Sequence, residues 1–339
     1  MKRMLCVSSA LVLTMVTAAC GAPPVGIGVP DKRPTRHTIV FYGFSVQEEV
    51  MTEEIFPAFA ARWRQQTDEE VTFRSVFTSS EQISAAIIKG APADVAVLAN
   101  EQHAVWLRIT DSIETDWRTF PHQGMISRSP IVIVVRPGNP LDISTWDDLA
   151  DTGVRLVHAH PATSGGAQWA LLAEYGASML RPGGSKEAAR EQLQRIWANV
   201  VVTPPSSREA LRQFIFGTGD ALVTYEQDAL LAQSRGAALE VIVPPRTFVS
   251  EHPVVIVDAN VTPYQRDVVE AFAAFLWSDA AQRAFTRYYF RAVTDEALND
   301  AVPEFHRLDQ SFTVQDLGGW ERAYPDIIEG VWAEELAEP

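Results

Sequence analysis

The chain has 339 residues, of which 28 are Lys or Arg and 43 are Asp or Glu, so its formal net charge at pH 7 is −15. This balance excludes a protein that binds nucleic acid through a general surplus of basic residues, and a hydrophobic content of 47% excludes a chain too polar to fold. The length predicts about two domains of roughly 150 residues each.

The first twenty residues have the pattern of a bacterial export signal. Two basic residues precede an apolar stretch from Met4 to Ala19, which is shorter than the roughly 20 residues that a membrane-spanning helix needs. Cys20 follows, so residues 1–20 are predicted to be a lipoprotein-type signal peptide, with Cys20 as the lipidated first residue of the mature protein. The alternative is plain cleavage after Ala19, which leaves a free thiol. Either route places the protein in the periplasm or at the cell surface.

Residues 21–36 are rich in Pro and Gly and have neither helical nor strand periodicity, so they are predicted to be a flexible tether. The other cysteine, Cys6, lies within the export signal. No disulfide and no cysteine-based metal site is therefore expected in the folded part, and no cofactor is expected.

From His37 onward, short β-branched runs alternate with amphipathic helical patterns. The first series predicts strands at 37–42, 70–76 and 95–98, with helices at 46–65 and 80–89. Strands separated by helices are typical of a parallel sheet with helices on its faces. A second series predicts strands at 131–135, 154–158, 199–203 and 221–223, with helices beginning near 166 and 208.

The apolar run Pro253–Val257, within residues 247–260, predicts a strand that returns to the first sheet, and a helix is predicted to follow at 263–277. A return after the second series makes the first lobe discontinuous and places a ligand cleft at the hinge. The chain is therefore predicted to form two α/β lobes, each a mostly parallel sheet wrapped by helices. The first lobe comprises 37–125 and 247–339, the latter including C-terminal helices, and the second lobe comprises 126–246.

Serines precede four of the predicted helices. Ligands of open α/β sheets bind where strands end and helices begin, and these loops carry Ser45, Ser79, Ser164 and the pair Ser206–Ser207. The spacing of Ser45 to Glu48, and of Ser79 to Gln82, is that of a capping box, so helix capping is the structural alternative for each serine.

The third loop, Ser164-Gly165-Gly166, is harder to explain by capping. Two glycines at a helix start weaken the helix by roughly 1 kcal/mol each relative to alanine. Without side chains, however, their N–H groups can approach an anion closely at the positive end of the helix dipole. This loop therefore predicts an oxyanion site that needs no lysine, which suits an acidic protein.

Several short segments together resemble one protein family. The chain is similar, from about His37 to Trp332, to the periplasmic sulfate-binding proteins of ABC importers, which have the type II periplasmic-binding-protein fold. The segments that carry the resemblance are Phe56–Phe59, Ala93–Ala96, Thr163–Trp169, Gly219–Glu226, Ser250–Pro253, Phe312–Val314 and Gly318–Trp320. The resemblance implies a solute-binding protein that closes over sulfate or thiosulfate and presents it to a permease and ATPase complex. It implies no catalysis, and a monomer is expected.

The resemblance also implies which residues bind the anion. Ser79 matches a hydroxyl donor, and Ser164, Gly165 and Gly166 match the amide donors of the family's Ser-Gly-Gly loop. The remaining expected ligand residues are Ser45, Ser207 and Tyr225, and Arg208 is expected to support the loop without touching the anion.

Three positions depart from the family pattern. Tyr225 replaces a tryptophan, Ser80-Glu81 replaces Gly-Lys, and Gly43-Phe44-Ser45 replaces an Asp-Pro-Thr-Arg type of run. A phenol donates or accepts whereas an indole N–H only donates, so the identity of the anion stays open among sulfate, thiosulfate, molybdate and phosphate. Phosphate carries a proton that needs an acceptor, so a carboxylate turned into the cleft favours phosphate; the candidates are Glu48, Glu81, Glu209 and Glu226.

Other functions leave weaker signals. His158 and His160 would share one face of a strand as a metal pair, but no third ligand is adjacent. Tyr288-Tyr289 resembles the adjacent tyrosines of ferric-ion-binding proteins, although core packing explains this aromatic helix end. The sequence contains no nucleophile elbow, Walker loop or HExxH motif. A ligand sensor that keeps the fold without transport is the remaining alternative.

Overall fold

Two long strands connect two halves of one sheet in the computed structural model, which describes residues 35–337. The predicted signal peptide, Cys20 and almost all of the predicted tether lie outside these residues. The strand order is β2-β1-β3-β9-β4-β7-β5-β6, with β10 beside β9 and β8 beside β4. The strands are β1 Arg36–Phe44, β2 Glu70–Thr78, β3 Val95–Val97, β4 Met125–Val135, β5 Leu156–His158, β6 Val200–Val202, β7 Ala221–Tyr225, β8 Glu240–Ile242, β9 Arg246–Ile256 and β10 Gln310–Phe312.

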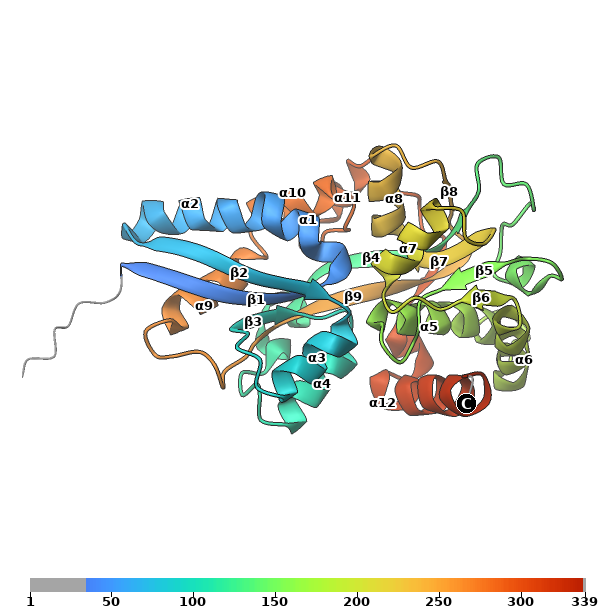
Figure 1. Ribbon diagram of the computed structural model, residues 1–339, viewed down its shortest axis with the longest axis horizontal. Helices are drawn as coiled ribbons and strands as arrows, with labels where there is room; N and C mark the ends of the chain where they lie inside the picture. The colour runs from blue at the N-terminus through green and yellow to red at the C-terminus, as the bar shows by residue number, and fades with distance from the viewer. Residues whose placement is uncertain (1–34, 338–339) are drawn as a thin grey trace, which may run out of the picture. The chain divides into compact units, whose positions relative to one another are not determined.

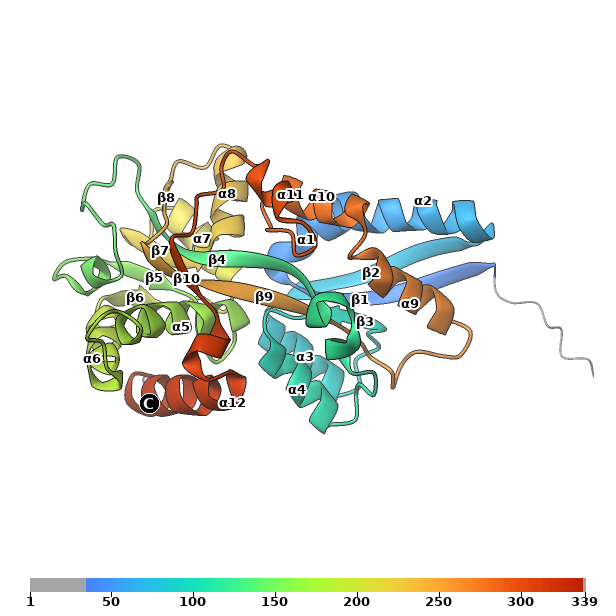
Figure 2. The same ribbon diagram turned by 180° about the vertical axis from the view of Figure 1, so that it is seen from behind.

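Strands β4 and β9 run side by side through the middle of the sheet (Figures 1 and 2). The far end of β9 pairs with β3, and the far end of β4 pairs with β7, in both cases antiparallel. The remaining pairs of each half, β1 with β2 and β3, and β5 with β6 and β7, are parallel. We refer to the half with β1, β2 and β3 as lobe I and to the half with β5, β6 and β7 as lobe II.

Helices cover both faces of each half. In lobe I, α2 lies on one face and α3 and α4 on the other; in lobe II, α7 and α8 lie on one face and α5 and α6 on the other (Figure 1). The α-helices are α1 Glu48–Val50, α2 Phe56–Thr67, α3 Ser80–Ile88, α4 Glu101–Ile109, α5 Gly165–Met179, α6 Lys186–Trp197, α7 Ser207–Ile215, α8 Glu226–Ser234, α9 Arg266–Phe275, α10 Asp279–Arg287, α11 Glu296–Asp300 and α12 Trp320–Ala323. No helix within residues 35–337 combines the length and the apolar character that crossing a membrane requires.

Short 3-10 and π segments complete the secondary structure. The predicted helix 46–65 is confirmed as an unbroken helical run over 45–67, which begins with the 3-10 turn η1 and contains the π-helix η2 between α1 and α2. These segments are η1 Ser45–Gln47, η2 Met51–Ile55, η3 Trp117–Thr119, η4 Pro121–Gly124, η5 Asp147–Ala150, η6 Val314–Leu317 and the C-terminal π-helix η7 Tyr324–Ala333.

The alternation of strands and helices is confirmed, as is the return strand, since β9 pairs with β3. Both connecting strands are longer than predicted, because their shared middle carries polar residues that break the apolar runs. Those residues are buried and bonded to one another: Ser127 Oγ lies 2.9 Å from His252 Nδ1, and Ser250 Oγ donates to the Ser129 carbonyl at 2.6 Å. The strands are therefore continuous across the hinge.

Candidate functional site

A small cavity lies where the two lobes meet. All seven residues predicted to bind the ligand line it, although they come from both lobes and from five separate loops. The lining consists of Phe44, Ser45, Val46, Ser79, Ser80, Ala99, Ser164, Gly165, Gly166, Ser206, Ser207 and Tyr225. The structure thus brings the predicted set together around a space suited to a small inorganic ion.

Three α-helices and one 3-10 turn begin at this cavity. The first residues of α3, α5, α7 and η1 are Ser80, Gly165, Ser207 and Ser45, and each of them lines it. The starts of α3, α5 and α7 face the middle of the sheet in Figure 1. The first amide groups of a helix have no acceptor within that helix. Amides from both lobes therefore converge with the positive ends of their helices.

Close contacts explain why the third loop carries two glycines. A Cβ on Gly165 would lie 2.8 Å from Ala99 Cβ and 2.9 Å from His103 Cε1, both in lobe I. A Cβ on Gly166 would overlap the Ser207 hydroxyl and lie 2.8 Å from the Tyr225 ring. Glycine at 165 therefore allows the two lobes to approach each other at the cavity, and glycine at 166 allows the loops of lobe II to do so.

Two buried hydroxyl groups at the cavity have no partner among the described residues. Ser79 Oγ and the Tyr225 hydroxyl are both inaccessible to solvent and unbonded. Burial and the negative charge of Asp228 raise the pKa of Tyr225 well above its ordinary value, so its phenol keeps the proton and can donate. A buried hydroxyl without a partner is costly, so both groups are suited to an anion that fills the cavity.

The predicted capping roles of two serines are wrong. Ser79 makes no side-chain cap to α3, and the Gln82 side chain accepts from Thr78 Oγ1 at 2.6 Å. Ser45 makes no cap either, and Glu48 is exposed. By contrast, the hydroxyl of Ser164 does cap α5, accepting from the Ala167 amide at 3.3 Å. At α7 the cap is Ser206, which leaves the amide of Ser207 at the helix start.

No charged side chain lines the cavity among the residues described. Arg208, beside Ser207, turns its guanidinium to Glu49 of lobe I at 2.6 and 2.8 Å and to Asp228 at 3.2 Å. Burial opposes its charge, but Asp228 and Glu49 outweigh burial and raise its pKa. Arg208 therefore does not line the cavity itself.

The other carboxylates considered from the sequence also have partners elsewhere. Glu81 lies 2.9 Å from His103 Nε2, and Glu209 lies 2.7 Å from Arg212. Glu226 is buried and pairs with Arg291 at 2.9 Å. The cavity therefore presents hydrogen-bond donors and no carboxylate.

Direct contacts hold the lobes together at the cavity. Asn100 Nδ2 donates to Gln168 Oε1 at 2.8 Å, and Trp169 Nε1 donates to the Ala99 carbonyl at 2.6 Å. With the Arg208–Glu49 pair, these contacts enclose the cavity between lobes I and II. Ala99 was missed from the sequence because the loop after β3 carries no serine, although it follows a strand end like the others.

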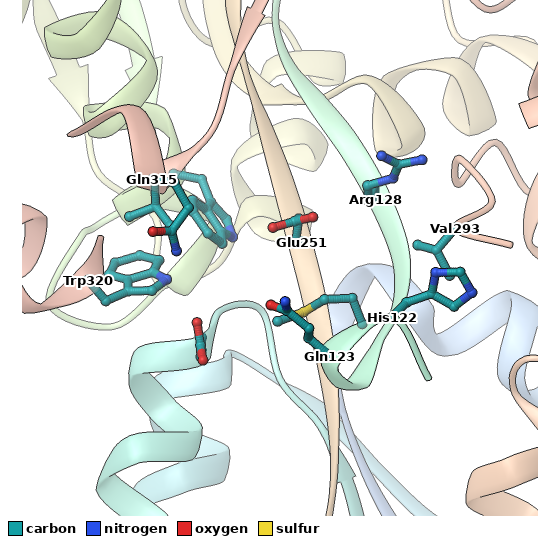
Figure 3. A pocket seen from close by; sticks show the side chains of 11 residues that line it. His122, Gln123, Arg128, Glu251, Val293, Gln315 and Trp320 are labelled. Carbon is teal, nitrogen blue, oxygen red and sulfur yellow. The ribbon is translucent and has the colours of Figure 1, made fainter. Parts of the chain in front are cut away.

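A larger hollow of about 340 Å³ lies beside the connecting strands and holds none of the predicted ligand residues (Figure 3). Glu251 on β9 and Glu101 at the start of α4 both line it, with Trp320 and Gln315 from the C-terminal segment. Arg128 and His122 line it too, so this hollow mixes acidic and basic side chains, unlike the smaller cavity.

The alternative metal residues have structural partners. His158 is fully buried, and burial lowers its pKa to about 4, so the ring is neutral; its Nδ1 lies 2.7 Å from the Ala159 carbonyl. The Tyr288 hydroxyl donates to Glu53 at 2.6 Å, away from the cavity. Residues 35–337 contain no group of three or more His, Cys, Asp or Glu side chains placed to hold a metal ion.

Comparison with known proteins gives consistent relatives. The family model described as "Bacterial extracellular solute-binding protein" matches residues 51–291. A sulfate-binding protein of Synechococcus elongatus is 33% identical over 98% of this chain and 94% of its own length. A thiosulfate-binding protein of Pseudomonas aeruginosa is 30% identical over 81% of this chain and 86% of its own length. Among solved structures, the sulfate-binding protein SubI of Mycobacterium tuberculosis H37Rv superposes with a TM-score of 0.79 at 29% identity, covering 86% of this chain and 99% of SubI.

Proposed function

The chain belongs to the bacterial extracellular solute-binding proteins, in the branch of the sulfate-binding proteins, and on that premise we propose that it captures sulfate or thiosulfate outside the cytoplasm for an ABC importer. The anion would lie in the cavity between the lobes. The proposed ligands are the amides of Ser45, Gly165, Gly166 and Ser207 and the hydroxyls of Ser79, Ser164 and Tyr225. The amide role expected for Ser164 is wrong, because that amide donates to the His160 carbonyl at 2.9 Å; its hydroxyl is therefore the proposed ligand group. Arg208 would support the loop through Glu49 and Asp228.

One observation carries this proposal: the cavity offers donors from both lobes and neither a carboxylate nor a cation. Sulfate at neutral pH has only acceptor oxygens, so every contact with such a site is satisfied. Hydrogen phosphate carries a proton that needs an acceptor. No carboxylate among the described residues lines the cavity to accept it, and the hydroxyls that do line it are weaker acceptors, so phosphate should bind less tightly than sulfate. Because water is excluded, the charge-assisted bonds to the dianion are strong without a lysine or arginine in contact.

We expect the two lobes to close over the anion when it binds, by bending about β4 and β9. The closed, loaded protein would then dock on the permease and its ATPase. Members of this family are solute-binding proteins, and we propose that this chain likewise binds its ligand without chemical change. We further propose a monomer, attached to the membrane through lipid on Cys20.

The test is a thermal-unfolding series on the mature, unlipidated chain in a chloride buffer with added sulfate, thiosulfate, molybdate or phosphate. A ligand at about 100 times its Kd adds about 2.7 kcal/mol to the folded state, which raises the midpoint by roughly 5 °C for a domain of this size. Sulfate or thiosulfate should give this rise and phosphate should not. A rise with phosphate alone, or none with any anion, would reject the proposal.

Molybdate is also an acceptor-only dianion, so the same chemistry admits it and size must discriminate. Titration calorimetry with sulfate, thiosulfate and molybdate ranks the three directly. A much lower Kd for molybdate would reassign the substrate while keeping the site. Ferric ion gives a separate negative control, because the cavity offers donors where a cation needs acceptors.

A further inference from the structure

Three side chains form a hydrogen-bonded chain that starts at the wall of the cavity. Ser80 Oγ lies 2.8 Å from His103 Nδ1, and His103 Nε2 lies 2.9 Å from Glu81 Oε2. The Ala99 amide also donates to Ser80 Oγ, at 2.9 Å. The imidazole of His103 is fully buried, whereas 28% of the Glu81 side chain is exposed. A buried titratable ring is thus linked on one side to the cavity and on the other to solvent.

The ring lies directly behind a proposed anion donor. Its Cε1 atom would be 2.9 Å from a Cβ placed on Gly165, the first residue of α5. Ser80, which lines the cavity, is the first residue of α3. A positive charge on His103 would therefore lie close to a bound dianion, with little water between them to screen it.

The partners fix what each protonation state does. An ionised carboxylate only accepts, so Nε2 of His103 carries a proton toward Glu81. In the neutral ring, Nδ1 is then an acceptor, and the Ser80 hydroxyl must donate to it. In the protonated ring, Nδ1–H donates to Ser80 Oγ, which already accepts from Ala99. The Ser80 proton is then released from the ring and is free to donate to an anion in the cavity.

We propose that His103 takes up one proton from solvent when the oxyanion binds, so that the Ser80–His103–Glu81 chain supplies a titratable counter-charge to a cavity without a cationic lining. This inference rests on the proposed function and adds that pH regulates the affinity for the anion. His103 acts through Ser80 and is a positioning residue, which touches no ligand itself. Affinity for a fixed dianion then rises as pH falls.

The surroundings of the ring leave Glu81 as the charged group that faces it. Trp106, one turn later on α4, packs against the ring at 5.1 Å between centroids, and Asn100 lies at the start of the same helix. From η7, Tyr324 contacts Trp106, and burial together with the charges of Glu81 and Glu329 raises its pKa to about 12, so it stays neutral. From α5, the uncharged Gly165 lies beside the ring.

The test is calorimetric titration of the mature chain with sulfate between pH 5.5 and 8.5, because sulfate remains a dianion throughout. Uptake of one proton makes log Kd rise with pH with a slope that approaches one. We expect Kd to be about tenfold or more higher at pH 8.5 than at pH 5.5. Repeating the titration in buffers of different ionisation enthalpy counts the protons taken up. A Kd that does not change with pH, with no proton uptake, would overturn the inference while leaving the proposed function intact.

Two variants locate the proton. His103→Gln should bind with a flat pH profile and no proton uptake. Glu81→Gln keeps the imidazole but removes its anionic partner, so the sloping part of the profile should move to lower pH. His37→Gln is the matched control. His37 lies 3.2 Å from Glu69 in a similar His–Glu pair, at the end of β1 that is remote from the cavity. The slope of log Kd against pH in this variant should equal that of the wild type.

Each result has a distinct meaning. If the slope of log Kd against pH is unchanged in His103→Gln, the inference is overturned. If His103→Gln does not fold, Glu81→Gln decides: a pH profile of Kd identical to that of the wild type would overturn the inference. Absence of binding of both sulfate and thiosulfate at every pH in the wild type would overturn the proposed function together with the inference.

Discussion

A methyl group at residue 165 should prevent the lobes from closing. In Gly165→Ala the new Cβ would lie 2.8 Å from Ala99 Cβ, 2.9 Å from His103 Cε1 and 3.1 Å from Asn100 Nδ2, all across the lobe boundary. Two carbon atoms in contact are about 3.5–4.0 Å apart, so relief requires the lobes to separate by about 1 Å. The variant therefore acts as a wedge at the cavity itself.

The size of the effect follows from the hydrogen bonds that this opening lengthens. A separation of about 1 Å stretches a bond of about 2.9 Å beyond the useful range. Bonds to a charged ligand contribute about 1.5–3 kcal/mol each, so losing two of them on one lobe costs at least about 3 kcal/mol. Kd should rise on the order of a hundredfold.

The assay compares sulfate titrations with thermal unfolding of the unliganded protein. Alanine is a better helix former than glycine by up to about 1 kcal/mol, so the unliganded Gly165→Ala variant should be no less stable than the wild type. Adding Ala99→Gly removes the atom nearest the new methyl group and should restore part of the affinity. Wild-type affinity in Gly165→Ala alone would refute this account of the site.

Three further predictions concern hydroxyls, the cross-lobe ion pair and pH. Ser79→Ala and Tyr225→Phe each remove an unpartnered buried hydroxyl, so each should raise the Kd for sulfate about tenfold without lowering the unliganded melting temperature; a loss of stability with unchanged affinity would contradict this. Glu49→Gln removes the charge that Arg208 meets across the lobes, so Kd should rise less than in Gly165→Ala, and titrations at low and high salt should show a weaker salt dependence than in the wild type. Burial lowers the pKa of His252 to about 3, below its unfolded value of about 6.5; the unfolded chain thus binds more protons between these values, and stability should fall as pH drops from 6.5 toward 4 in urea unfolding, which a constant midpoint would refute.

Local sequence determined most of the elements and the composition of the site. β-branched runs and helical periodicity locate the strands and helices because these patterns are set by the geometry of each element alone. The same holds for the loops: parallel strands bring their carboxyl ends to one edge, so serines and glycines that follow strands are candidates for one site. Ser79, Gly165 and Tyr225 all line the cavity for this reason.

Only the tertiary structure decided which of these groups are free. Ser79 and Ser164 are both placed for capping in the sequence, yet Ser164 caps its helix and Ser79 does not. The directions of Glu81 and Glu226 likewise depend on His103 and Arg291, each more than twenty residues away in the chain. Such pairings determine whether the groups that line the cavity are hydrogen-bond donors or acceptors.

The polar middle of the two connecting strands and the Ser80–His103–Glu81 chain could not be predicted from local sequence pattern, for the same physical reason. The middle of β4 and β9 is polar, and it is strand because Ser127 and Ser129 find partners on the neighbouring strand. His103 lies in α4, and the loop before α4 carries no serine or glycine that would mark it as part of the site. The proposed role of His103 arises from its contact with Ser80 and its position beside Gly165. Sequence specifies which donors and acceptors a chain carries, but the cost of burying them is met by partners that only folding brings within hydrogen-bond distance.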